Sequence, residues 1–127
     1  MDEPNNTLPI SLASLPTNVV VEKVRRDYSD RMLPSEALGA VSDMLACYPH
    51  PPANERYIGS LAFLLASYPR SVALRCTDPI KGVARHCKYP PTIGDVSEWC
   101  EHDVGYMRRI IERDDRFRAI ERENQRD

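Results

Sequence analysis

The chain has 127 residues, of which 42% are hydrophobic and 28% are charged, so one compact domain is expected. Its 17 basic and 19 acidic residues give a net charge of -2, which argues against a general nucleic-acid binder. The longest apolar run, Ile58 to Ala66, contains Gly59 and Ser60 and is too short to cross a bilayer. The acidic start, MDEPNNTLPI, does not resemble a secretory signal. We therefore expect a cytoplasmic protein that makes no contact with a membrane.

The cysteine spacing predicts free thiols rather than disulfides or a metal site. No C-x-x-C pair occurs, and a chain without a secretory signal is expected to keep its thiols reduced. Three histidines lie near cysteines, but Pro51 and Pro52 follow His50, and adjacent His86 and Cys87 do not easily share a tetrahedral ion. We expect no metal and no other cofactor. The cysteines are Cys47, Cys76, Cys87 and Cys100, and the third histidine is His102.

The first half of the chain predicts an N-terminal arm followed by two helices. Residues 1–15 contain Pro4, Pro9 and two asparagines without any periodicity, which is typical of a flexible arm. A helix is expected from about Thr17 to Met32, and a second from Pro34 until Pro49 stops it. The apolar stripes expected on these two helices are Val20, Val21, Val24 and Tyr28, and then Leu38, Val41, Met44 and Leu45.

A Tyr-Pro pair recurs at three helix ends. "MLACYP" at 44–49 returns as "LLASYP" at 64–69, and "KYPP" follows at 88–91. Either Tyr48, Tyr68 and Tyr89 close one end of a bundle, with their rings on the core and their hydroxyls in water, or the three helix ends are unrelated. Two helices are expected between these stops. The first covers 55–67 and has on its inner side Tyr57, Leu61, Leu64 and Leu65; the second covers 70–77, has on its inner side Val72, Ala73 and Cys76, and has Pro69 at its first position. A further helical turn is expected around Ile80, Val83 and Ala84.

The stretch "HCKYPPTIGDVSEWC" starts the longest helix. Thr92 suits an N-cap and Asp95 has the capping-box spacing. An apolar stripe follows at helical steps, and it consists of Ile93, Val96, Cys100, Val104, Met107 and Ile111. A helix over 92–122 would be about 45 Å long, whereas a bundle of this size has a radius of gyration of about 14 Å. The sequence therefore predicts an all-α fold, a small helical bundle with a long C-terminal helix, in which 16–111 form the helical domain and the charged end 112–127 projects.

No catalytic residues are predicted, because no nucleophile stands near a base and the adjacent Asp114 and Asp115 point to different sides of a helix. A nucleic-acid surface is the alternative reading of the segment 70–90, where five basic residues face only Asp78. A small helical DNA-binding regulator would use these residues, although we expect weak or no direct DNA binding. They are Arg70, Arg75, Lys81, Arg85 and Lys88.

A protein partner is the preferred interpretation of the chain's end. Residues 101–127 hold eight acidic residues and seven arginines, with no lysine, and arginine suits interfaces. Apolar residues among these charges could dock in a partner's groove or pair two copies as a homodimer, and a solvated, frayed helix end is the alternative. The candidate partner-binding residues are Arg108, Arg109, Arg113, Arg116, Phe117 and Ile120.

The succession of Tyr-Pro stops and "KYPPTIGDV" resembles small phage proteins that load or inhibit the replicative DNA helicase. The resemblance covers about residues 45–100 and implies an all-α, non-enzymatic adaptor, with a C-terminal part that engages the helicase. An inhibitor of another host machine, such as a defence complex, is an alternative within the same class. The matching positions are Leu45, Tyr48, Pro49, Tyr57, Leu64, Tyr68, Pro69, Lys88, Tyr89, Pro90, Pro91, Thr92, Ile93, Asp95 and Val96.

Overall fold

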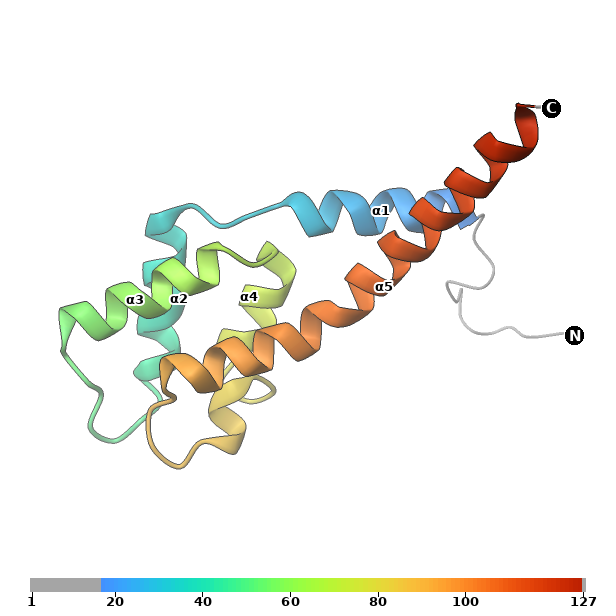
Figure 1. The fold of residues 1–127 in the computed structure, drawn as a ribbon. Coiled ribbons are helices and arrows are strands. Elements are labelled where there is room, and N and C mark those ends of the chain that lie inside the picture. Colours follow the sequence, from blue (N-terminus) through green and yellow to red (C-terminus); the bar gives the residue numbers. More distant parts are fainter. Residues whose placement is uncertain (1–16, 127) are drawn as a thin grey trace, which may run out of the picture. The chain divides into compact units, whose positions relative to one another are not determined.

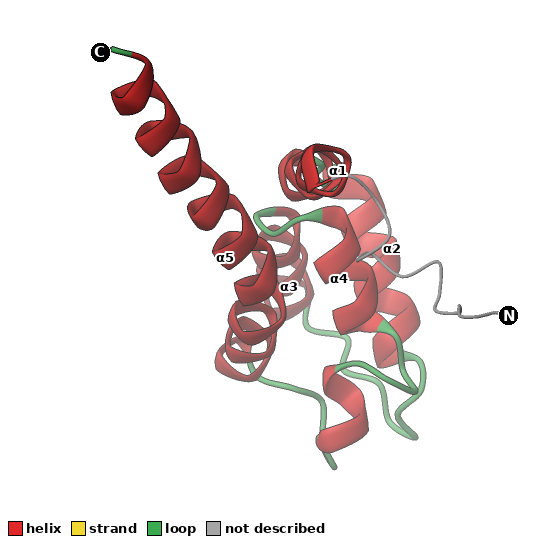
Figure 2. Cartoon of the chain, turned by 90° about the vertical axis from the view of Figure 1, so that its right-hand side faces the viewer, coloured by secondary structure: helices red, strands yellow, loops and turns green. Residues whose placement is uncertain are grey.

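The computed structural model describes residues 17–126, and the arm expected over 1–15 lies outside this range. The all-α fold is confirmed, because the described residues form helices and loops with no strand (Figure 2). The helices are α1 (Thr17–Ser29), α2 (Pro34–Leu45), α3 (Glu55–Ala66), α4 (Arg70–Thr77) and α5 (Ile93–Gln125), with a short 3-10 helix, η3 (Val83–His86).

The packing divides the chain into two compact units. One, here called the core unit, comprises residues 27–106 and contains α2, α3, α4, η3 and the first part of α5 (Figure 1). The other, here called the helix-pair unit, comprises in its described part residues 17–26 of α1, 107–125 of α5 and Arg126. The sequence suggested a different boundary, after Ile111.

The core unit is built around α2, which packs against α3 and α4. The buried positions of α2 recur at steps of four, three and one, which keeps them on one side of the helix. Helices α3, α4 and the first part of α5 contribute similar apolar stripes. The buried side chains are Ala37, Val41, Met44 and Leu45 of α2, Leu61, Ala62 and Leu65 of α3, Val72, Ala73 and Cys76 of α4, Val83 of η3, and Val96, Cys100 and Val104 of α5.

Several apolar residues that the sequence assigned to the core are not fully buried, and four of them illustrate why. Leu38 is 45% exposed and Leu64 is half-buried, because each lies at the edge of its helix's buried stripe. Ile93 is exposed at the first position of α5, and Ile80 is exposed in the turn before η3. Helical phase therefore identified the inner side of each helix but not how far the buried stripe extends around or along it.

The expected capping box at the start of α5 is confirmed. The Thr92 backbone N–H donates to Asp95 Oδ2 at 3.0 Å, and the Asp95 backbone N–H donates to Thr92 Oγ1 at 3.0 Å. Just before the cap, the carbonyl of Pro91 accepts a hydrogen bond from the Tyr57 hydroxyl at 2.5 Å. This bond ties the loop before α5 to α3. Where the sequence placed Pro69 at the first helical position, the structure has it as the N-cap of α4.

The tyrosines of the three Tyr-Pro pairs have different environments. The Tyr48 hydroxyl donates to the Cys87 carbonyl at 3.1 Å, and the Tyr68 hydroxyl donates to Glu101 Oε2 at 2.6 Å. Burial raises the pKa of both hydroxyls. Tyr89 is 74% exposed, so the expectation that all three rings close one end of the bundle is wrong. The hydroxyls of Tyr48 and Tyr68 bind protein groups rather than only water.

Gly82 allows the chain to turn tightly after α4. Its N–H donates to the Asp78 carbonyl at 2.8 Å, and Asp78 Oδ1 accepts from the N–H of Ile80 at 2.9 Å. A Cβ atom at position 82 would overlap the carbonyl oxygens of Arg75 and Cys76. The close approach of backbone to backbone therefore requires glycine here.

Candidate protein-interaction surface

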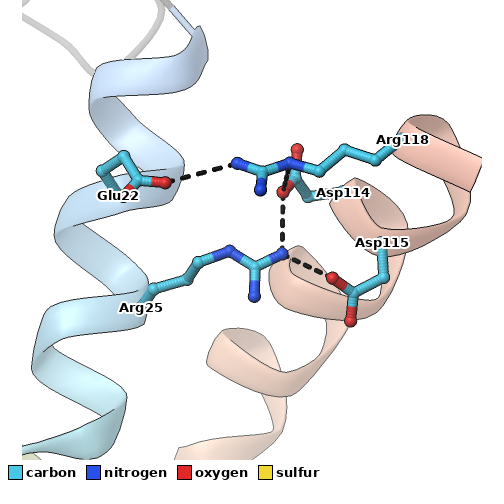
Figure 3. Close-up of polar contacts among 5 residues, drawn as sticks. All are labelled: Glu22, Arg25, Asp114, Asp115 and Arg118. Atoms are coloured by element: carbon cyan, nitrogen blue, oxygen red, sulfur yellow. Dashed lines mark hydrogen bonds and ion pairs between the residues drawn. The ribbon is translucent and has the colours of Figure 1, made fainter. Parts of the chain in front are cut away.

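Helices α1 and α5 run antiparallel within the helix-pair unit and are joined by charged side chains. Arg25 Nη2 donates to Asp114 Oδ2 at 2.8 Å and to Asp115 Oδ1 at 2.5 Å (Figure 3). One turn earlier on α1, Glu22 accepts from Arg118 at 3.3 Å. Because Arg25 pairs with residues 114 and 115 while Glu22 pairs with residue 118, the two helices must run in opposite directions.

Asp114 is the centre of this network. Its side chain is only 14% exposed and accepts from both Arg25 and Arg118, each at 2.8 Å (Figure 3). The hydrogen bonds from Arg25 to Asp114 and then to Asp115 raise the pKa of the Arg25 guanidinium above its ordinary value. These two carboxylates therefore act as ion-pair partners of α1.

An apolar hollow of about 440 Å³ lies beside this network in the same unit. Val20 and Val21 of α1 and Ile110 and Phe117 of α5 line it, and Arg113 and Asp114 complete its wall. Val21 is buried, whereas Phe117 is 59% exposed and both lines the hollow and reaches solvent. The hollow can accept an apolar side chain from outside.

Most of the sequence-predicted partner-binding residues share one side of α5. At about 100° per residue, Arg109, Arg113, Arg116, Phe117 and Ile120 fall within an arc of about 100°. We call these five residues the open strip. All are exposed, and the three arginines have no ion-pair partner within residues 17–126. Arg108, the sixth candidate, lies about 80° outside the arc and is half-buried, so the structure does not bring it to this surface.

The five basic residues suggested for nucleic acid do not act as one set. Arg70 is bound to Glu36 at 2.7 Å and to Asp30 at 3.1 Å, which ties α4 to the first turn of α2 and to the loop before it. Arg75 is bound to Asp103 at 2.8 Å. Three residues remain exposed without an ion pair among the described side chains, and they are Lys81, Arg85 and Lys88.

One apolar surface in the core unit was missed from the sequence. Phe63 is 82% exposed and lines a hollow of about 210 Å³ with Leu38. The rest of its lining comprises Pro34, Gly59, Ala62 and Ala66. Phe63 lies between Leu61 and Leu65 but off the stripe that they define, and this departure from phase was the available signal.

A more polar cavity of about 500 Å³ lies in the core unit between η3 and α5. Glu98, Trp99 and His102 of α5 line it together with His86 and Cys87. Burial raises the pKa of the Cys87 thiol, which keeps it protonated at neutral pH and weakly nucleophilic. Within residues 17–126, no three side chains of histidine, cysteine, aspartate or glutamate are grouped so that they could hold a metal ion.

Comparison with known protein families, with curated proteins and with solved structures found no match. Among the described helices, none has a stretch both long and apolar enough to span a bilayer.

Proposed function

We propose that this protein is a non-enzymatic adaptor that binds another protein through the helix-pair unit. The observation that carries the proposal is the exposure of Phe117 and Ile120, each 59%, beside an apolar hollow. Exposed apolar side chains grouped beside a hollow and surrounded by charge are typical of protein-binding surfaces. Arginine at the edge of such a surface supports the same reading.

The packing of the helix-pair unit supports this proposal. Its described part comprises residues 17–26 of α1, residues 107–125 of α5 and Arg126. Among the larger apolar side chains of the unit, only Val21 and Met107 are buried within the described residues. A partner that covers Phe117 and Ile120 would stabilise the unit.

The specific partner that we propose is a replicative DNA helicase, with the protein acting in the cytoplasm as a phage-derived loader or inhibitor. The resemblance of residues 45–100 to helicase loaders and inhibitors supports this choice. Another host machine, such as a defence complex, would engage the same surface. The ion pairs of Arg70 and Arg75 leave less positive charge for phosphate contacts, which favours the adaptor over a DNA-binding regulator.

The experiment compares two exposed phenylalanines. Phe117→Asp places a charge in the helix-pair surface, and Phe63→Asp places the same charge on the core unit at an even more exposed position. Each purified variant is tested for binding to the purified host helicase and for capture of cross-linked partners in host cells. We expect Phe117→Asp to lose binding and Phe63→Asp to keep it, with both chains folded. Retention of every partner by Phe117→Asp would refute the proposed surface.

Removal of residues 112–127 is the second test. It deletes the acceptors of Arg25 but none of residues 27–106. We expect the core unit to unfold at nearly the same denaturant concentration, monitored by Trp99, the single tryptophan, while partner binding is lost. Binding by the truncated chain would move the interaction surface to the core unit.

A further inference from the structure

Some charged side chains of the helix-pair unit form ion pairs inside its described part, whereas the arginines of the open strip do not. Asp114 and Asp115 are bound to Arg25 and Arg118 inside the unit. One of these two acidic residues, Asp114, lines the hollow. The arginines of the open strip have no such partner among the described residues.

The open strip therefore presents positive charge beside exposed apolar side chains. Arg109, Arg113 and Arg116 lie within the same arc as Phe117 and Ile120. No acidic residue of 107–126 falls within this arc, although Glu112, Glu121 and Glu123 lie just outside its edges. A second copy of this chain docked through the same strip would bring three arginines against three arginines. That repulsion disfavours self-association through this surface.

From this arrangement we propose that the open strip and the hollow bind an acidic amphipathic helix of the partner. Apolar side chains of that helix contact Phe117 and Ile120 and enter the hollow, at the i, i+3, i+4 and i+7 spacing of helix-in-groove recognition. Its carboxylates pair with Arg109, Arg113 and Arg116, each of which offers a planar guanidinium fork. This inference rests on the proposed function and names the chemistry of the partner at the same surface.

The test uses two synthetic helical peptides of about five turns. Both carry leucine at the i, i+3, i+4 and i+7 positions; one carries glutamate beside the leucines and its twin carries lysine. Binding of the fluorescein-labelled peptides to the full chain is measured by fluorescence anisotropy. We expect the glutamate peptide to bind at least about ten-fold more tightly than the lysine peptide, and to weaken as salt screens the charges.

Charge-reversed variants locate the binding. The triple variant R109E/R113E/R116E should lose at least about ten-fold in affinity for the glutamate peptide, as charge pairs at an interface require. The control K81E/R85E/K88E changes the net charge by the same amount on the core unit and should bind as the unmodified chain does. Because all six side chains are exposed, both variants should keep the circular dichroism of the parent.

Several outcomes would overturn the inference. They are failure of the glutamate peptide to bind, equal binding of the two peptides, and an equal loss in the two triple variants. A chain that sediments as a dimer, and as a monomer after Phe117→Asp, would identify a second copy as the occupant. If Phe117→Asp loses its cellular partner while R109E/R113E/R116E keeps it, the proposed function stands and the acidic helix is wrong. If Phe117→Asp keeps every partner, the proposed function itself fails.

Discussion

Truncation of Leu65 to alanine tests the packing of the core unit most directly. Leu65 is fully buried in α3, and Leu61 of the same helix and Val41 of α2, which packs against α3, are buried to the same extent. A cavity made there cannot easily collapse, so the loss should lie within the range of about 2–5 kcal/mol measured for buried leucines. In a unit of this size, each kcal/mol lowers the midpoint of thermal unfolding by about 4–8 °C. We therefore expect a decrease of at least about 8 °C.

Leu64→Ala is the matched control, because it makes the same substitution one position earlier in the same helix. Leu64 is half-buried, so its truncation should cost about 1 kcal/mol. Both variants are unfolded in urea and monitored by the fluorescence of Trp99, with circular dichroism as a second probe. A larger loss for Leu64→Ala than for Leu65→Ala would mean that α3 is rotated relative to the orientation described above. A loss below about 1 kcal/mol for Leu65→Ala would contradict its burial.

Three further substitutions test local features. Gly82→Ala should destabilise the core unit in thermal unfolding, because its Cβ overlaps carbonyl oxygens at the end of α4; an unchanged midpoint would contradict that close approach. Thr92→Ala should cost about 0.5–2 kcal/mol in urea unfolding by removing the acceptor for the Asp95 N–H, and an unaltered stability would mean that the cap is replaced by water. Glu36→Gln tests the pH dependence of stability. The hydrogen bond from Arg70 lowers the pKa of Glu36 in the folded chain. The contribution of the Glu36 carboxylate to the free energy of unfolding is therefore complete above the unfolded-state pKa of about 4.3 and is lost as the pH falls through the lower folded-state pKa. The stability difference between Glu36→Gln and the parent should therefore be present at neutral pH and vanish in strong acid, and a constant difference would refute the pairing.

Local signals in the sequence were sufficient to predict the helices of the described region. Proline at 34, the capping box of Thr92 and Asp95, and the stripe of Val96, Cys100 and Val104 depend on neighbours within a few residues. The sequence therefore predicted the all-α class and most helix boundaries. The first helix was expected to continue to Met32 but ends at Ser29, where no comparably strong stop signal occurs.

Only the tertiary structure decided which side chains are exposed and unpaired, and therefore available to bind a partner. The sequence showed mixed charge near the end of α5, but the contact with α1 assigns Asp114 to Arg25 and leaves Arg113 and Arg116 without an ion-pair partner among the described residues. Pairing between residues about 90 positions apart depends on the packing of two helices, and no local pattern encodes it. The helical phase of Phe63 placed it off the buried stripe, but only the structure shows the hollow that Phe63 lines with Leu38. Composition and phase determine which helices form, and packing over long sequence distances decides which of their surfaces remain open.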